Sequence, residues 1–165
     1  MLINVKIYSK RNDNMDIQTL YDDIKEYALN TQGVESVTFG DVYTVWNSLH
    51  ITYGCFNAAL NYVEYDDSTA RFYLTLYYAD KLKNDSSNIY QVQTTGFNAI
   101  RNVISHLVDS YELEGIESLR IYPFAQKFAD ILAGAYADVT VYVPIDVCVD
   151  YDKPEPNDGT EEGGE

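Results

Sequence analysis

Residues 61–82 read NYVEYDDSTARFYLTLYYADKL. Two runs rich in aromatic and β-branched residues flank the turn formers Asp66-Asp67-Ser68, a pattern that predicts a β-hairpin. The returning strand alternates between two rows, one apolar (Phe72, Leu74, Leu76, Tyr78) and one mixed (Arg71, Tyr73, Thr75, Tyr77). The apolar row predicts a face covered by a helix. The mixed row is unlike an ordinary solvent-facing row because it carries two tyrosines.

Two helices are predicted to flank this hairpin in sequence. The first spans residues 15–30, with Asp13 or Asn14 as its cap, Gly33 closing it, and an apolar stripe of Ile17, Leu20, Ile24 and Ala28. The second spans residues 88–111, and Asn88 and Gln91 have the spacing of a capping box. Its apolar face is wide enough to cover the hairpin, and Gly96 and Ala99 permit close approach to the sheet.

The remaining segments predict further strands. Residues 34–45 have strand propensity broken at Gly40-Asp41, residues 46–56 are ambiguous with a bend at Gly54, and residues 119–124 form a strand that breaks at Pro123. A helical turn is predicted at 127–132 and an alternating strand at 133–143. Residues 1–8 alternate weakly, as a short strand or an extended arm. This order predicts an α+β fold, a mainly antiparallel sheet covered by two helices.

Charge is distributed unevenly along the 165 residues, whose formal net charge is −15. Residues 146–165 hold eight acidic residues and one lysine, together with two prolines and three glycines. We therefore expect one domain over residues 1–145, followed by a flexible or extended acidic segment at 146–165. Basic residues are scattered, and Lys6, Lys10 and Arg11 form the one small cluster, which argues against tight phosphate binding.

No run of 18 apolar residues and no signal peptide is found, so we expect a soluble, intracellular protein without a membrane partner. The spacing of Cys55 and Cys148 indicates buried thiols in a reducing compartment rather than a disulfide.

The search for catalytic chemistry yields no candidate. His50 and His106 lack a ligand at metal-binding spacing, which favours structural roles. Adjacent acids at 22–23 and 66–67 are typical of a solvated helix face and of a turn. No phosphate-binding glycine loop or nucleophile motif occurs. We therefore expect no enzyme activity and assign no catalytic, metal-binding or cofactor-binding residue.

Tyrosine, with 16 copies, is the over-represented residue. Six aromatic residues on or beside the predicted non-core strand rows are candidates for a subunit interface, where tyrosine supplies contact area at low entropic cost. They are Tyr73, Tyr77, Tyr122, Phe124, Tyr136 and Tyr142. The alternative is that the helix at 15–30 covers this face, and both interpretations can hold for different tyrosines.

Three segments together carry a resemblance to a known group of proteins. They are Tyr78–Leu82 with Asp85–Asn88, Gln93–Gly96, and Tyr122–Phe124 with Lys127–Gly134 and Val139–Pro144. This arrangement resembles virion proteins of tailed bacteriophages that infect Bacteroidetes, including the crAss-like phages, in which small α+β proteins similar to tail terminators form rings at the head–tail junction. The resemblance covers about residues 15–148, so nothing is carried over to either terminal segment.

The resemblance implies a tail-terminator-like fold and a cyclic homo-oligomer, six- or twelvefold, in the phage neck. Such a ring, assembled in the host cytoplasm, would stack on portal or tail proteins and let DNA pass without specific binding. An acidic channel would repel DNA and let it slide. The alternative hypothesis is an acidic adaptor or DNA-mimic protein that binds a basic host partner. A hydrolase with unrecognised carboxylates is the third and weakest hypothesis.

Overall fold

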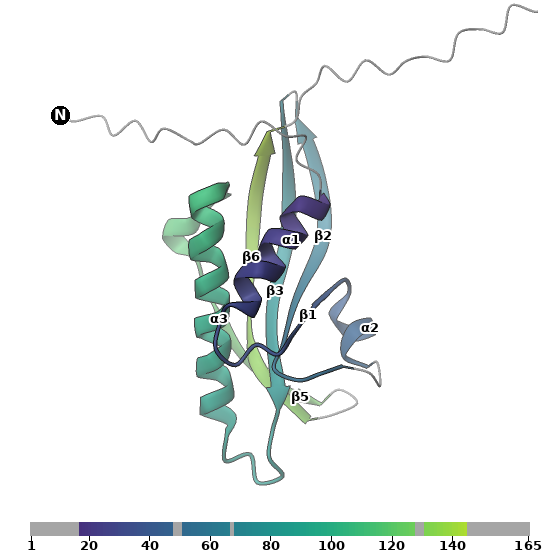
Figure 1. Cartoon of the computed structure of the whole chain (residues 1–165), viewed down its shortest axis with the longest axis vertical. Coiled ribbons are helices and arrows are strands. Elements are labelled where there is room, and N and C mark those ends of the chain that lie inside the picture. Colours follow the sequence, from purple (N-terminus) through teal and green to yellow (C-terminus); the bar gives the residue numbers. More distant parts are fainter. Residues whose placement is uncertain (1–16, 48–50, 67, 128–130, 145–165) are drawn as a thin grey trace, which may run out of the picture.

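The computed structural model describes residues 17–47, 51–66, 68–127 and 131–144. Within them the chain forms an α+β domain with a mixed, six-stranded open sheet (Figure 1). In chain order the elements are α1 (Ile17–Leu29), β1 (Ser36–Phe39), α2 (Val42–Trp46), β2 (Cys55–Asp66), β3 (Thr69–Lys81), α3 (Ile89–Ser110), β4 (Glu112–Glu114), a 3-10 turn (Ile116–Ser118), β5 (Tyr122–Lys127) and β6 (Ile131–Pro144). The strand order is β1-β2-β3-β6-β4, and β5 also pairs with β6.

The predicted hairpin is confirmed as the centre of the sheet. β2 and β3 pair antiparallel from Cys55 with Ala79 to Asp66 with Thr69, and a bulge at Asn61 shifts the register. β6 pairs antiparallel with the whole of β3, while β5 and β4 share the other edge of β6. β1 alone runs parallel to its neighbour, β2, so the sheet is mixed rather than purely antiparallel.

The core lies between the sheet and two helices that cover the same face. Both predicted apolar stripes are buried, with Leu20 and Ile24 of α1 and Ile100 and Leu107 of α3 as central members. They pack on the apolar row of β3, as the alternation predicts. Gly96 allows the expected close approach, since a Cβ there would lie 3.1 Å from both Ala135 and Tyr78.

The interpretation that the helix at 15–30 covers the tyrosine row is wrong. α1 lies beside α3 on the opposite face, where Asn102 donates to Thr31 Oγ1 at 2.7 Å. The Tyr111 hydroxyl also donates to Asp23 at 2.6 Å. The apolar stripe of α1 packs on the same apolar sheet face as α3. The tyrosine row carries polar groups, against which an apolar stripe would pack less favourably.

The strand predicted at 34–45 is wrong in its second half. β1 ends at Phe39, and Asp41 then caps the short helix α2 by accepting from the Thr44 backbone N–H at 2.9 Å. β-branched valines at 42 and 45 suggested a strand, but the cap and the burial of Trp46 outweigh that weak preference. Gly40, with φ at +113°, makes the break between the two elements, and the bend expected at Gly54 is present, with φ at +49°.

Three further boundaries differ from the prediction. The prediction of a helical turn at 127–132 is wrong for the residues of this range that the structure describes, because Lys127 ends β5 and Ile131 begins β6. The strand predicted at 119–124 is observed at 122–127, and Pro123 is tolerated because β5 is an edge strand. Asn88 precedes α3 without a side-chain cap bond, and its amide bonds the backbone of Lys81 and Lys83 instead.

Several predictions fall outside the described residues. These concern the alternation at 1–8, the caps at Asp13 and Asn14, His50, Cys148 and the acidic segment 146–165. Within the part of the chain that the structure describes, no helix is long and apolar enough to cross a bilayer.

Candidate subunit interface on the sheet

All six aromatic residues selected from the sequence lie on one sheet face. Residues directly opposite each other in a sheet share a face. Tyr77 is opposite Tyr136, which is opposite Tyr122, and Phe124 is opposite Gly134 in the same alternating row. Tyr73 and Tyr142 belong to these rows as well. We call the face that carries these six residues the tyrosine face; it is the one turned away from α1 and α3.

One end of the tyrosine face is covered by α2. Trp46 is buried there, its ring 5.6 Å from that of Tyr77 in an edge-to-face contact and 5.7 Å from that of Phe124. Stacking continues across the strands from Tyr77 to Tyr136 (5.8 Å) and on to Tyr122 (5.3 Å). Burial raises the pKa of Tyr77 above its ordinary value. Tyr122 is the most exposed of the six selected aromatic residues, with 41% of its surface accessible to solvent.

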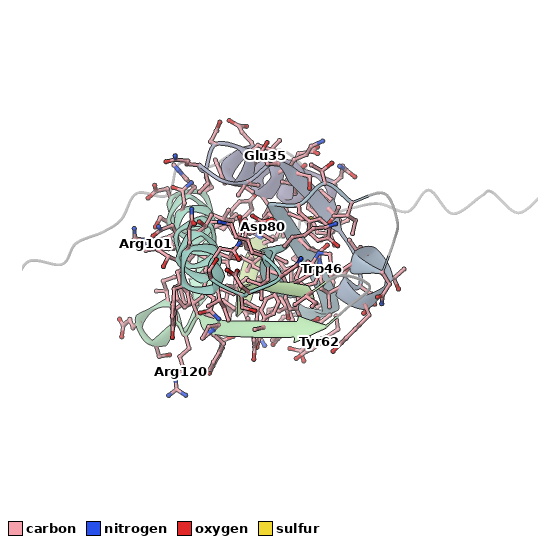
Figure 2. The ribbon with its side chains drawn as sticks, turned by 90° about the horizontal axis from the view of Figure 1, so that it is seen from below. Glu35, Trp46, Tyr62, Asp80, Arg101 and Arg120 are labelled. Carbon is pink, nitrogen blue, oxygen red and sulfur yellow. The ribbon has the colours of Figure 1, made fainter. Side chains whose placement is uncertain are left out.

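The other end of the tyrosine face, toward the tip of the β2–β3 hairpin, has no helix over it among the described residues. Tyr62 stacks on Tyr73 with ring centroids 4.1 Å apart and is itself 53% exposed. In Figure 2, which looks along the strands, Tyr62 lies on the far side of the sheet from α1. The bulge at Asn61 brings Tyr62 opposite Tyr73, a pairing that alternation alone does not predict.

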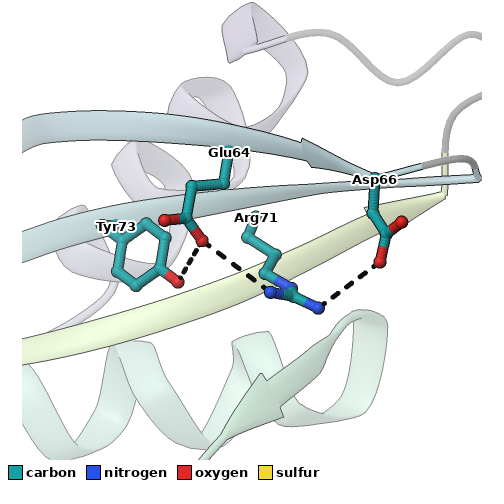
Figure 3. Close-up of polar contacts among 4 residues, drawn as sticks. All are labelled: Glu64, Asp66, Arg71 and Tyr73. Atoms are coloured by element: carbon teal, nitrogen blue, oxygen red, sulfur yellow. Dashed lines mark hydrogen bonds and ion pairs between the residues drawn. The ribbon is translucent and has the colours of Figure 1, made fainter.

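A polar cluster surrounds these rings (Figure 3). The Tyr73 hydroxyl donates to Glu64 Oε2 at 2.8 Å. Arg71 reaches the same oxygen at 3.7 Å with one guanidinium nitrogen and Asp66 at 3.6 Å with the other. Arg71 thus pairs with two carboxylates, those of Glu64 and Asp66. Because the ion pairs are exposed, they orient side chains more than they stabilise the fold.

Two tyrosines in this region have raised pKa values. The hydrogen bond to the Glu64 carboxylate raises the pKa of Tyr73 to about 12, because that bond needs the neutral phenol. Burial, followed by the hydrogen bond and the charge of Glu114, raises the pKa of Tyr142. Arg71 lies 5.6 Å over the Tyr142 ring. Both phenols therefore remain neutral hydrogen-bonding groups at physiological pH.

Partly buried polar contacts lie between the α2 end and the hairpin end of the tyrosine face. Asn61 donates to Thr75 at 3.0 Å, and Thr75 donates to Asp138 at 2.7 Å. Beside them Asn57 is fully buried, accepts from Thr38 at 2.9 Å and donates to the Gly40 carbonyl at 3.1 Å. These bonds satisfy groups that would otherwise be costly under the sheet surface. They hold the strands of the tyrosine face in register.

Sequence reasoning missed three members of this surface. Trp46 lies on a helix that was predicted as strand, and Tyr62 depends on the bulge. Glu64 was left unassigned, although its place opposite Arg71 in the hairpin was a signal that could have found it.

The aromatic side chains are the feature of this face that bears on binding. Tyrosine rings with polar edges gather on this face, and aromatic residues of this kind are enriched at protein interfaces. Among the described residues, no three His, Cys, Asp or Glu side chains group as metal ligands. His106 is exposed on α3 and stacks on Tyr27 at 4.7 Å. Cys55 is a buried free thiol.

No protein-family model matches the chain, and no curated protein matches it.

Proposed function

We propose that this protein is a structural subunit of a phage head–tail connector or tail-terminator ring. In this role it bridges the portal and the tail, associates with copies of itself, and lets genomic DNA pass. The resemblance of residues 15–148 to phage virion proteins supports the assembly type. The tail-terminator-like form of the fold, the ring and the virion location are parts of this proposal.

The observation that carries the proposal is the convergence of six aromatic residues on one sheet face. They come from β3, β5 and β6, which are far apart in sequence. Tyrosine and tryptophan are enriched at protein interfaces relative to the rest of the protein surface, so a row of stacked tyrosines is more typical of an interface than of a solvent-facing sheet. The exposed part of this face includes Tyr62 (53%) and Tyr122 (41%). We infer that a neighbouring subunit packs here.

The charge of the chain supports passage of DNA rather than its capture. The net charge of −15 and the scattered basic residues argue against the clustered phosphate contacts that release counterions. A ring whose lumen is acidic would keep DNA mobile by repulsion. A lumen wall found to be neutral or basic in the assembled particle would remove this part of the proposal.

Native mass spectrometry and negative-stain electron microscopy of the purified full-length chain test the ring. We expect closed six- or twelvefold rings, either alone or on a partner protein, and the chain should be found by mass spectrometry in purified virions. A chain that stays monomeric at high concentration, forms no ring on any partner and is absent from virions overturns the proposal.

A second candidate function is an acidic adaptor that binds a basic host protein. The shared cation at Arg71, beside the exposed Glu112 and Glu114 opposite Tyr142 and Thr140, favours it by giving the hairpin end of the tyrosine face a net negative charge. Recovery of a stoichiometric host partner in a pull-down, together with absence from virions, would select this function over the ring.

A further inference from the structure

One acidic side chain lies among the aromatic residues of the tyrosine face. Asp138 is exposed and lies between Tyr136 and Tyr142 in the same alternating row of β6. It is opposite Thr75 of β3, whose hydroxyl donates a hydrogen bond to Asp138 Oδ1 at 2.7 Å. Tyr77 belongs to the next pair on this face, and burial, followed by the charge of Asp138, raises its pKa. The carboxylate is therefore held in place among tyrosine rings.

A partner that covers this part of the face has to compensate the carboxylate of Asp138. Asp138 forms no ion pair within the part of the chain that the structure describes, and its one bond to Thr75 leaves acceptor positions unused. Removing water from such a carboxylate is costly unless a cation takes its place. The neighbouring rings favour the same kind of group, because a cation over a tyrosine ring is attracted to it. The site therefore suits a guanidinium or ammonium group.

Arg120 projects from the edge of the same face. It lies in the segment 115–121, which connects β4 to β5, the two strands that pair with the outer edge of β6. In Figure 2 the Arg120 side chain points outward on the far side of the sheet from α1, the side on which Tyr62 lies. Arg120 is exposed, and it too takes part in no ion pair with another described residue. One subunit thus carries both members of a complementary charge pair.

The segment 115–121 matches the tyrosine face in a second way. It also carries Ile116, an aliphatic side chain that is 38% exposed. The buried centre of an interface is more apolar than its rim and is enriched in aromatic residues and arginine. Arg101, the one basic residue of α3, is flanked instead by the polar side chains of Asn98 and Ser105 on the exposed face of that helix. Arg120 is therefore the better match for the tyrosine face.

We propose that the segment 115–121 of one copy docks on the tyrosine face of the next copy, with the Arg120 guanidinium against the Asp138 carboxylate. This contact joins an edge of one subunit to a sheet face of its neighbour. It is heterologous, the type of contact that generates rings when its rotation closes. The inference rests on the proposed self-association and identifies the charge pair that joins the subunits.

Reversal of each charge tests the contact, with sedimentation velocity of the full-length chain as the measurement. Arg120→Asp places an acid against Asp138 of the next copy, and Asp138→Arg places a guanidinium against Arg120. Each variant alone should raise the dissociation constant between subunits about tenfold or more. An equimolar mixture of the two variants should restore assembly, because alternating subunits then join opposite charges at every contact. Mixing can restore assembly only if the pair forms between copies.

Two further variants serve as controls. Asp138→Asn removes the charge but keeps an oxygen that can accept from Thr75, so it should weaken assembly while urea unfolding of the subunit stays close to wild type. This variant carries the test if Asp138→Arg fails to fold, which circular dichroism shows. Arg101→Asp makes the same reversal at an exposed position on α3 and should leave assembly unchanged.

The outcomes separate this contact from the ring itself. If wild type forms rings and both Arg120→Asp and Asp138→Asn assemble as well as wild type, the contact is wrong while the ring stands. Impaired variants that mixing does not restore overturn the pairing of these two residues. A wild-type chain that stays monomeric at every concentration and on every partner overturns the proposed function, and this inference with it.

Discussion

Tyr73 is the residue at which the tyrosine face and the charged cluster meet. It stacks on Tyr62 and donates its hydroxyl to Glu64, which also faces Arg71. The bond exists only while the phenol keeps its proton, which is why the pKa of Tyr73 rises from 10.0 to about 12. The interaction therefore makes stability dependent on pH in the alkaline range.

Tyr73→Phe should lower stability at neutral pH, and the loss should vanish in alkali. A group whose pKa is raised on folding contributes its full stability below the unfolded pKa, here 10.0, and loses it as pH rises through about 12. Urea unfolding of wild type and variant across this range measures the difference in free energy of unfolding. A difference that is constant with pH would contradict the assignment. In Glu64→Gln, the Tyr73 phenol should titrate at a lower pH than in wild type.

Tyr78 shows the same chemistry inside the core. Its ring is buried under α3, and its hydroxyl donates to the Gly33 carbonyl at 2.9 Å, which fixes the loop after α1. Burial raises the pKa of this phenol well above 10.0.

Tyr78→Phe should therefore destabilise the fold by about 0.5–1.5 kcal/mol, because the Gly33 carbonyl loses its partner while the ring still fills its site. Tyr27→Phe is the control, since its hydroxyl makes only an exposed 3.5 Å contact with Ser110. Chemical denaturation of both variants measures the difference. Equal effects would show that the Gly33 bond contributes nothing specific.

At the level of elements, the contact between α3 and the sheet depends on a small residue. Gly96 faces β3 and β6, and a Cβ placed there would lie 3.1 Å from Ala135 and from the Tyr78 ring. The helix can approach this closely because no side chain intervenes. Three further helical positions, Ala99, Ile100 and Val103, are then fully buried.

Gly96→Val should push α3 from the sheet and cost about 1–3 kcal/mol or more, because the added methyl groups meet backbone as well as side chains. Asn98→Val places the same side chain on the exposed face of the same helix and should change stability by a few tenths of a kcal/mol, roughly its helix propensity. Thermal or urea unfolding compares them. Equal stability of the two variants would contradict the close packing at Gly96.

The short helix α2 has a different role from α1 and α3. It places Trp46 over Tyr77 and Phe124 and so removes one end of the tyrosine face from solvent. The hairpin end keeps its rings and charges accessible. If subunits associate through this face as proposed, the contact would depend on Tyr122, Tyr62 and Tyr142.

For the whole molecule, the proposed ring predicts that a charge on the tyrosine face weakens assembly. Tyr122→Lys, at a 41% exposed position, should raise the dissociation constant between subunits about tenfold or more, since a desolvated ammonium without a partner opposes docking. Tyr90→Lys on α3 should leave assembly unchanged. Sedimentation velocity measures both, and circular dichroism checks that both remain folded. Unimpaired assembly of the Tyr122 variant would exclude this part of the face from the interface.

Much of the local structure follows from residue periodicity. The hairpin, the apolar stripes of α1 and α3, the strand at 133–143 and the membership of Tyr73, Tyr77, Tyr136 and Tyr142 in non-core rows were predicted. Alternation with period two determines which side chains share a face of a strand, and a period near 3.6 does so for a helix. Both are properties of the local backbone and need no knowledge of distant contacts.

Tertiary structure decided what those faces meet. Tertiary packing places α1 beside α3 rather than over the tyrosines. Residues 42–46, which the sequence predicts as strand, form a helix that buries Trp46, and β1 pairs parallel with β2. Tertiary packing also brings Tyr122 and Tyr62 into line with the other aromatic residues. An apolar stripe specifies burial but not its partner, because the free energy of burial depends on area and not on which element covers it. The amino-acid sequence therefore determined the two faces of the sheet, and only the packing of distant segments determined which of them α1 and α3 cover.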